Sequence, residues 1–405
     1  MNSRESSPSY HGWKVAAAGA LGATVSFGAL FVYTFSVFLK PLTAEFGWTR
    51  EQASRGFAVA AMSVALSSPF LGRALDRVAA PRAILLPAFA IFGAGIAALS
   101  LLQGSLAQFY LTLMIIGLVA NATTQMGYSG VVSSWFRERR GIALAAVTAG
   151  VGVGSIVHPV LSQWMIANYG WREAYLLLGM LILLCGIPLT ALWVRRSDTK
   201  MTAGQFTAGA TVRDALSSKE FWFLALTLFL SSMAANGSLT HMAAHLSDRG
   251  LTVGDAALVT GLLGAANLCG RFLTGWLLDR YSGPRISFVL LMLMAMGMTL
   301  ARDASTFAAA AIAAICIGVG LGGEADVTPY LLSRYFGLRN FSLLYGLTWT
   351  FYALAGAAGP VAFGRVFDQT GSYGQVLTAG AILTAISSIF MLLLREPKPL
   401  VDSGY

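Results

Sequence analysis

The sequence predicts an all-α membrane protein with twelve transmembrane helices in two pseudo-symmetric six-helix halves. Three observations support this prediction: an apolar composition, twelve long apolar windows and an internal repeat. Hydrophobic residues make up 56% of the 405 residues and charged residues only 11%, whereas a soluble domain carries about 25% charged residues. The 44 glycines are typical of membrane helices, which approach one another closely through small residues.

Apolar windows long enough to cross a bilayer recur along the chain. A spanning helix needs about 20 mainly apolar residues. Such windows cover residues 13–39, 52–72, 82–102, 108–134, 141–166, 173–194, 220–246, 254–278, 285–302, 305–333, 341–366 and 373–394. Backbone groups in hydrocarbon must bond within their own segment, so we expect each window to be helical. Strands of a membrane β-barrel would alternate polar and apolar residues, and these windows do not.

One long polar segment, from Arg195 to Lys219, divides the chain nearly in half. Its mixture of charged residues and glycine is typical of a flexible linker. We therefore expect an N-terminal six-helix half over residues 1–195, a cytoplasmic linker over 196–219 and a C-terminal six-helix half over 220–405.

The distribution of positive charge predicts the topology. Most of the 27 lysines and arginines fall on the side of the predicted spans that also holds both chain ends. Cytoplasmic loops are enriched in these residues, so we expect a multi-pass protein of the cell inner membrane with both termini in the cytoplasm. Loop topology explains the net charge of +9 better than nucleic-acid binding does. No cleavable signal peptide is expected, because the first apolar run is too long.

The cysteines do not indicate a metal centre. Cys185, Cys269 and Cys316 lie far apart in apolar segments, without the spacing of a metal site or a disulfide framework. We expect reduced thiols, no metal and no cofactor. HExxH, GxSxG and CxxC motifs do not occur, which argues against an enzyme. A transporter-like sensor would need a signalling appendage, which the short polar tails do not provide.

A short charged segment occurs twice. Residues 72–82 read GRALDRVAAPR, and residues 275–285 read GWLLDRYSGPR. Each copy forms a predicted cytoplasmic loop, where a carboxylate can cap a helix N-terminus and arginines can form ion pairs. These contacts would have to break when the inner side opens. The gating residues predicted from this repeat are Asp76, Arg77, Asp279 and Arg280.

The doubled GxxxDR…R loop resembles the signature loop of the major facilitator superfamily. Helix count, linker and repeat agree with this resemblance over the whole chain. The resemblance implies the fold of that superfamily. It also implies alternating access, in which two halves expose a substrate first to one side of the membrane and then to the other.

Two further stretches resemble one branch of the superfamily, the monocarboxylate transporter family. Residues 135–154, WFRERRGIALAAVTAGVGVG, resemble its fifth-helix signature of an aromatic pair, two basic residues and then small residues. Residues 320–346 are similar to the tenth helix of bacterial members of the same broad group. The resemblance is therefore to a bacterial-type monocarboxylate transporter.

Arg271 is the clearest candidate for a substrate-binding residue. It lies about two turns inside the predicted span 254–278, and an ionisable group in a span costs roughly 2.5–3.5 kcal/mol on insertion scales. Its guanidinium fork suits a carboxylate. The alternatives are a permanent structural ion pair or a side chain that snorkels to the interface. The resemblance supports the substrate role, because the monocarboxylate family carries its anion-binding arginine at this helix-eight position.

Two positions depart from the animal members of that family. Asn267 stands where they carry an aspartate one turn before the arginine, and Tyr33 stands where they carry a first-helix lysine. Coupling is therefore expected to use other groups or the substrate's own proton. We expect Asn267, Tyr33 and Asn121 to complete the anion site, although lone polar residues more often bond neighbouring helices.

Candidates for proton coupling lie in the predicted seventh span and just beyond its end. His241, His245 and Asp248 share one helix face at i, i+4 and i+7. A histidine exchanges protons near neutral pH, so His241 is a candidate proton relay. A histidine at the outer mouth without a role in transport is an equal alternative. Asp248 has the alternative of a solvated loop acid.

Two acids lie in the predicted tenth span at about the depth of Arg271. Either Glu324 or Asp326 could pair with Arg271 in the empty carrier, or with gate arginines. We predict a gating role for Glu324 and a proton-coupling role for Asp326.

These observations together predict a secondary active transporter of a small, lactate- or pyruvate-like monocarboxylate, with a proton as co-substrate. Residues 341–364 contain no Lys or Arg, so this span lacks the second cation that similar dicarboxylate carriers hold there, and one buried cation suits one carboxylate. The alternatives are an organic-anion exchanger of the oxalate/formate kind and a drug/proton antiporter. The expected partners are the acid, a proton and the lipid bilayer, without nucleic acid, and the chain is expected to be monomeric.

Overall fold

The computed structural model describes Ser7 and residues 10–78, 80–136, 139–195, 210–278, 280–337 and 341–394. Within these ranges, the side chains of residues 69, 72–73, 76–77, 133, 140–141, 325–326 and 341–342 are not described. The side chains of four predicted site residues therefore lie outside the described part, namely Asp76, Arg77, Asp279 and Asp326.

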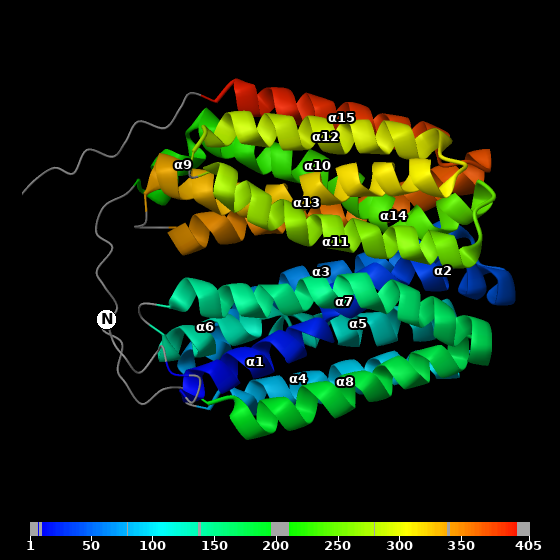
Figure 1. Cartoon of the computed structure of the whole chain (residues 1–405), viewed down its shortest axis with the longest axis horizontal. Coiled ribbons are helices and arrows are strands. Elements are labelled where there is room, and N and C mark those ends of the chain that lie inside the picture. Colours follow the sequence, from blue (N-terminus) through cyan, green and yellow to red (C-terminus); the bar gives the residue numbers. More distant parts are fainter. Residues whose placement is uncertain are drawn as a thin grey trace, which may run out of the picture. The chain divides into compact units, whose positions relative to one another are not determined.

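The first six predicted spans all form helices (Figure 1). The elements in chain order are α1 (His11–Thr24), the π-helical turn η1 (Phe27–Phe31), α2 (Val32–Phe46), α3 (Arg50–Arg77), α4 (Arg82–Ala98), the 3-10 turn η2 (Leu99–Leu101), α5 (Leu106–Thr123), α6 (Gln125–Trp135), α7 (Arg140–Tyr169) and α8 (Trp171–Trp193). Long apolar segments become helices because only a helix satisfies every backbone donor and acceptor within one segment.

The last six predicted spans are helical as well. The elements are α10 (Lys219–Asp248), α11 (Val253–Leu278), α12 (Gly283–Asp303), α13 (Phe307–Phe336), α14 (Phe341–Thr370) and α15 (Gly374–Leu392). The predicted linker contains the short helix α9 (Val212–Leu216). A capping box between Thr211 and Asp214 stabilises the start of this helix. These hydrogen bonds from Thr211 lower the pKa of Asp214, because they stabilise its charged form.

The chain separates into two compact units. The first comprises Met1–Thr202, Met242–Ala244 and Thr252–Gly261, and the second comprises Ala203–His241, His245–Leu251 and Leu262–Tyr405. The predicted boundary at residues 196–219 stays a prediction, and the main change of unit falls at residues 202–203.

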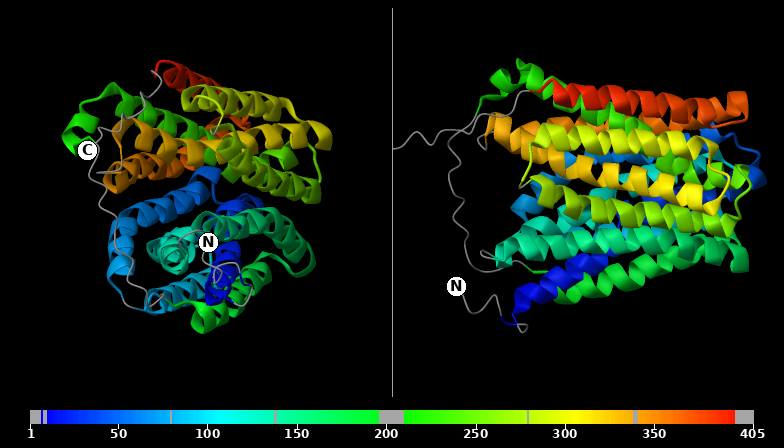
Figure 2. Two further views of the ribbon diagram at one scale, coloured as in Figure 1. Left: turned by 60° about the vertical axis from the view of Figure 1, so that its left-hand side comes forward. Right: turned by 45° about the horizontal axis from the view of Figure 1, so that its top comes forward.

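Both units contain the same helix pairings. In the first unit, α4 packs along α5 and α8. In the second unit, α12 packs along α13 and α15, and Figures 1 and 2 show these neighbours running side by side. Since α4 and α12 are the third spans of their halves, each third span contacts the fourth and the sixth. This correspondence is what a duplicated six-helix unit requires.

Ten helical segments among the described residues are long and apolar enough to span a membrane. They cover ten of the twelve predicted windows. The other two windows lie on α3 and α14, which are long enough, with 28 and 30 residues, but less apolar. Helix α3 begins with the polar residues Arg50, Glu51 and Gln52, and α14 is rich in Trp, Tyr, Thr and Gly, which contribute little hydropathy.

The first and fourth spans are broken rather than continuous. Helix α1 ends at Thr24, and Ser26 begins the π-helical turn by accepting a hydrogen bond from the backbone N–H of Ala29. The backbone N–H of Phe27 donates to Oγ1 of Thr123 at 3.2 Å, at the point where α5 gives way to α6. A side chain at the second break therefore satisfies a backbone donor at the first, as buried irregular backbone requires.

Close helix packing in the first unit depends on small residues. A Cβ atom at Gly150 of α7 would lie 1.9 Å from the backbone oxygen of Ala20 on α1. Only glycine permits this approach. Gly150 belongs to the stretch that resembles the fifth-helix signature, so that resemblance has a packing basis here.

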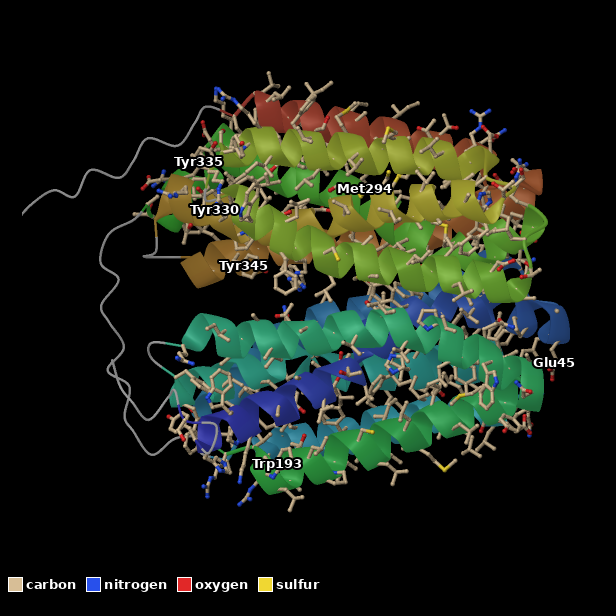
Figure 3. All side chains as sticks on the ribbon, in the orientation of Figure 1. Glu45, Trp193, Met294, Tyr330, Tyr335 and Tyr345 are labelled. Carbon is tan, nitrogen blue, oxygen red and sulfur yellow. The ribbon has the colours of Figure 1, made fainter. Side chains whose placement is uncertain are left out.

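Several tyrosine, tryptophan and glutamate side chains lie near the helix ends. Tyr330 and Tyr335 of α13 lie near one end of the second unit, whereas Met294 of α12 lies nearer the middle (Figure 3). In the first unit, Trp193 and Glu45 lie at opposite ends (Figure 3). Tyrosine and tryptophan are enriched at membrane–water interfaces, and this distribution fits helices that cross a bilayer end to end.

Candidate substrate and proton site

Arg271 is placed on α11, half-buried and two turns before the helix ends at Leu278. The guanidinium interacts electrostatically with the phenol of Tyr352 on α14. The same phenol interacts electrostatically with the carboxyl group of Glu324 on α13. The second unit thus brings an arginine, a tyrosine and a glutamate from three helices into one electrostatic neighbourhood.

Helices α11 and α13 are held close together beside these groups. A Cβ atom at Gly322 of α13 would lie 2.1 Å from the backbone oxygen of Asn267 and 3.1 Å from the backbone nitrogen of Arg271. One turn earlier, a Cβ atom at Gly318 would lie 2.4 Å from the backbone oxygen of Leu263. Small residues four apart allow two membrane helices this separation. The spacing fixes Arg271 and Glu324 on adjacent helices.

Glu324 is buried, with 8% of its surface exposed. Its Oε1 accepts hydrogen bonds from the hydroxyl groups of Ser231 at 2.5 Å and Ser232 at 2.9 Å, both on α10. Its Oε2 has no hydrogen-bond partner among the described residues. The predicted gating role assumed that Glu324 pairs with an arginine, but its hydrogen bonds go to serines of a neighbouring helix.

Asn236 completes this polar group from α10. Its side chain interacts with the phenol of Tyr352, and its Nδ2 donates to the backbone oxygen of Ser232 at 2.9 Å. One helix therefore supports both Glu324, through the serines, and Tyr352, through the amide. Such a shared support orients the polar side chains relative to one another.

His241 is held on both ring nitrogens. Its Nε2 lies 2.9 Å from the backbone oxygen of Pro360, to which it donates, and its Nδ1 lies 2.8 Å from the hydroxyl group of Tyr373. The ring is 1% exposed. This geometry suits a neutral imidazole that ties α10 to α14 and to the residue before α15. It favours the alternative of a histidine without a role in transport, and the proton-relay role stays a prediction.

The other two residues on this predicted helix face, His245 and Asp248, differ in burial. His245 is buried, and its Nε2 lies 2.8 Å from the backbone oxygen of Ala301 on α12. Asp248 is exposed at the end of α10. This face of α10 is therefore buried at His241 and exposed at Asp248.

The residues expected to complete the anion site belong to different units. Asn267 is half-buried on α11, one turn before Arg271. Tyr33 is buried on α2 in the first unit. Asn121 of α5 donates its Nδ2 to the hydroxyl group of Ser68 on α3. Of the three, Asn267 is the one that α11 carries together with Arg271.

The predicted gating residues are described in part. Arg280, just beyond α11, is exposed and donates its Nη1 to the backbone oxygen of Trp276 at 3.0 Å. Its guanidinium lies over the Trp276 ring, 4.2 Å from the centroid. Stacking on an aromatic ring is a favourable position for an exposed guanidinium. The gate itself stays a prediction.

Sequence reasoning did not single out Ser231, Ser232, Asn236 and Tyr352. A signal for the first three was present, because α10 carries Thr227, Ser231, Ser232 and Asn236 at helical spacing inside an otherwise apolar span. Polar residues on one face of a buried helix often bond its neighbours. Tyr352 gave no comparable signal, since aromatic residues are common in α14.

Within the described residues, no group of three or more His, Cys, Asp or Glu side chains is arranged to hold a metal ion. Cys185, Cys269 and Cys316 are free thiols. The chemistry that the described arrangement offers is binding of an anion by a guanidinium and binding of a proton by a carboxyl group.

Long apolar helices, repeated helix pairings and a partly buried ionisable cluster indicate a multi-pass membrane protein of the transporter class. A family model described as Major Facilitator Superfamily matches residues 20–360. The chain belongs to the major facilitator superfamily, and it is a transporter rather than an enzyme.

Curated relatives include monocarboxylate transporters. The rat (Rattus norvegicus) protein named monocarboxylate transporter 13 is 28% identical over 396 residues, which cover 94% of this chain and 89% of the relative. The multi-drug resistance efflux pump PmrA of Streptococcus pneumoniae is 24% identical over 381 residues, 92% of each chain.

A solved structure supports the fold. The crystal structure of a bacterial homolog to the human lysosomal transporter Spinster, in an inward-facing and occupied conformation, has a TM-score of 0.74 at 17% identity. The match covers 94% of this chain and 96% of that one. The predicted superfamily, its fold and the likeness to monocarboxylate transporters are confirmed.

Proposed function

We propose that this chain is a proton-coupled transporter of a small monocarboxylate, in the size range of lactate or pyruvate, that works by rocker-switch alternating access. The observation that carries the proposal is Arg271, a permanently charged fork inside α11 with Tyr352 beside it. The similarity to monocarboxylate transporters supports the same substrate class.

Arg271 suits a carboxylate for physical reasons. A guanidinium keeps its proton at any physiological pH and forms two parallel hydrogen bonds with a carboxylate. The phenol of Tyr352 adds a neutral donor near it. Removal of both charges from water strengthens their attraction, and the bound anion offsets the cost of a buried cation.

Arg271 thus receives the acid when the carrier is open to one side. The two halves then rock and release the acid on the other side, while the gating residues Asp76, Arg77, Asp279 and Arg280 control the cytoplasmic opening. Binding drives this change only to the extent that the acid prefers the state it leads to. We place the protein in the cell inner membrane as a monomer with both termini in the cytoplasm, in line with the positive charges of the predicted inner loops.

Uptake into proteoliposomes tests this function. The purified protein is tested with a panel of labelled short acids, namely lactate, pyruvate, acetate, formate and oxalate, with and without an inward proton gradient. Saturable uptake of a monocarboxylate that the gradient stimulates is the expected result. An anion exchanger would instead need internal substrate and ignore the pH gradient. Saturable uptake of none of the acids would contradict the proposal.

A drug/proton antiporter is the second candidate function. The similarity to a multi-drug efflux pump and the buried acid Glu324 favour it. Such a carrier requires a buried acid beside a wide apolar cavity, whereas the cavity at Glu324 measures about 20 Å³. Proton-dependent efflux of a lipophilic cation from the same proteoliposomes, without acid uptake, would establish this second function instead.

A further inference from the structure

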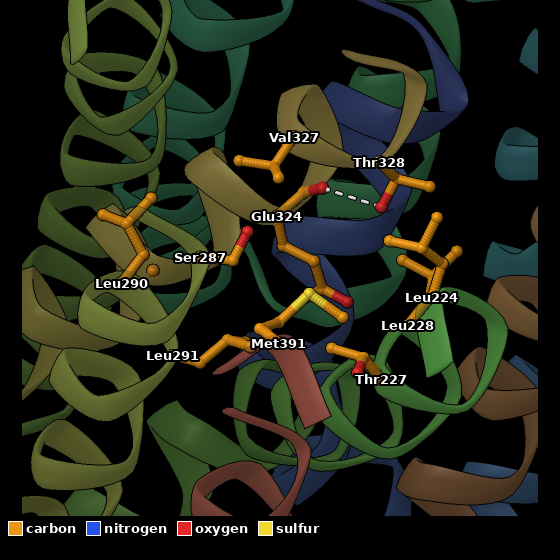
Figure 4. Close-up of a pocket in the computed structure, with 11 residues that line it drawn as sticks. Leu224, Thr227, Leu228, Ser287, Leu290, Leu291, Glu324, Val327, Thr328 and Met391 are labelled. Carbon is orange, nitrogen blue, oxygen red and sulfur yellow. Dashed lines mark hydrogen bonds between the residues drawn. The ribbon is translucent and has the colours of Figure 1, made fainter. Parts of the chain in front are cut away.

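The carboxyl group of Glu324 borders a small cavity inside the second unit. Figure 4 shows its side chain pointing toward Thr227 of α10 and Met391 of α15. The cavity measures about 20 Å³, about the room that one water molecule requires. Its other walls are mostly apolar, with the hydroxyl groups of Ser287 and Thr328 among them.

Glu324 accepts fewer hydrogen bonds than a permanently ionised carboxylate would be expected to accept. An ionised carboxyl group accepts at about four lone-pair positions. Here Oε1 accepts from Ser231 and Ser232, whereas Oε2 is buried without a partner among the described residues. A protonated carboxyl group fits this arrangement, because its hydroxyl oxygen becomes a donor and a water molecule in the cavity can accept from it.

We propose that Glu324, with Ser231, Ser232 and the adjoining cavity, is the proton-binding site of this transporter. The hydroxyl group of Ser232 stabilises the ionised form by donating to Oε1, and Ser231 can add a second such bond by turning its single hydrogen from the Thr227 backbone oxygen toward Oε1, whereas the apolar walls stabilise the protonated form. A group that the protein accommodates in both forms is suited to take up and release a proton during each cycle.

The ionisable side chains near Glu324 are the other groups that could respond to a change of pH. Among the described residues, α10 presents Thr227, Ser231 and Ser232, α12 presents Ser287 and α15 presents Met391, none of which exchanges a proton near neutral pH. The neighbouring ionisable groups are the phenol of Tyr352 on α14 and, beyond it, the guanidinium of Arg271 on α11.

This proposal rests on the proposed function and explains why acid and proton travel together. Binding of the carboxylate at Arg271 changes the buried charge by −1, and binding of a proton at Glu324 changes it by +1. The fully loaded site therefore has the same charge as the empty one, whereas either ligand alone leaves an extra charge inside the membrane. Because buried charge is costly, only the empty and the fully loaded carriers reorient readily.

Each cycle is balanced in protons and charge. The proton comes from the solution on the side where the acid binds, resides on a carboxyl oxygen of Glu324 while the halves rock, and leaves to the solution on the other side. One acid anion and one proton cross together, so uptake is electroneutral. A membrane potential imposed with potassium and valinomycin should therefore leave wild-type uptake unchanged.

Glu324→Gln tests the site, because glutamine resembles a permanently protonated glutamate. We expect the variant to lose gradient-driven accumulation, yet to retain exchange of labelled for unlabelled acid, with an exchange rate that no longer depends on pH. Glu173→Gln, at an exposed acid in the first turn of α8, is the matched control and should behave as wild type. Accumulation by Glu324→Gln at the wild-type level would overturn the proposal.

A second measurement needs no transported substrate, and its first part uses only the wild type. Infrared spectra of the purified wild type over a pH series should show the carbonyl band of a protonated carboxylic acid that disappears at high pH. Glu324→Asp should shift the band, and Glu324→Gln should remove it. If wild type transports none of the acids, this band still decides whether Glu324 binds a proton, and its persistence in both variants would overturn the site alone.

Discussion

Gly322 of α13 lies against the backbone of Asn267 on α11, so closely that a Cβ atom at Gly322 would stand 2.1 Å from the Asn267 oxygen. Arg271 follows one turn after Asn267, and Glu324 lies two residues after Gly322 on α13. The proposed anion site and the proposed proton site are thus carried by two helices that glycine holds together.

Gly322→Ala should therefore destabilise the protein and impair uptake. Alanine normally stabilises a helix by up to about 1 kcal/mol relative to glycine, but here its methyl group must push α11 away, at a cost of about 1–3 kcal/mol. Gly346→Ala on α14 is the control, because a Cβ atom there would meet no atom within 4 Å. Thermal unfolding in detergent measures the stability of the two purified variants. Equal melting temperatures for Gly322→Ala and Gly346→Ala would contradict this packing account.

His241→Gln should lower the melting temperature of the protein but leave the pH dependence of uptake close to that of the wild type. The ring bonds to the Tyr373 hydroxyl group and the Pro360 oxygen, and each lost hydrogen bond costs about 0.5–1.5 kcal/mol. Tyr373→Phe removes one of these bonds without changing the histidine, so it should cause a smaller loss. A variant with wild-type stability and no response to a proton gradient would instead establish His241 as the proton relay.

Thr123→Val should weaken the junction between the two broken spans. Valine keeps the shape of threonine but removes the oxygen that accepts from the Phe27 backbone N–H. A buried donor left without a partner costs about 1–3 kcal/mol. Thr112→Val on α5 is the control, since that hydroxyl group donates only to the Gln108 backbone oxygen within its own helix. If both variants unfold at the same temperature, the break at α1 does not depend on Thr123.

Single cysteines introduced into a cysteine-free background test the proposed topology. Ser217, just after α9, is expected in the cytoplasm, and Ser372, between α14 and α15, is expected outside. Both residues are exposed. A membrane-impermeant maleimide should label Ser372→Cys in intact cells, and Ser217→Cys only after permeabilisation. The reverse pattern would invert the orientation.

Much of the scaffold could be predicted from the sequence because its signals are local and periodic. Long apolar windows became helices, and the doubled loop segment anticipated the matching pairings of α4 and α12. The interruption at Ser26 was not predicted, since residues 13–39 form one long, mainly apolar run without a proline. That break depends on partners distant in sequence, such as Thr123, which a single window does not reveal.

The candidate site could be predicted only as separate residues. Its charged members, Arg271 and Glu324, were conspicuous because a span rarely tolerates such groups. The partners of Glu324 were not predicted, because which face of α10 meets α13 depends on helix packing. The hydrogen bonds from Ser231 and Ser232 support the proposed proton-binding role of Glu324, and its predicted gating role stays a prediction.

Uptake by Arg271 variants tests the central claim most directly. With whichever acid the wild type transports, Arg271→Gln should reduce uptake by about 10- to 100-fold, as expected for loss of a charged hydrogen-bond donor. Arg271→Lys should recover part of it, since lysine keeps the charge but not the fork. Arg213→Gln, at an exposed arginine of α9, should leave uptake unchanged. Wild-type uptake by Arg271→Gln, at equal protein in the liposomes, would contradict the account.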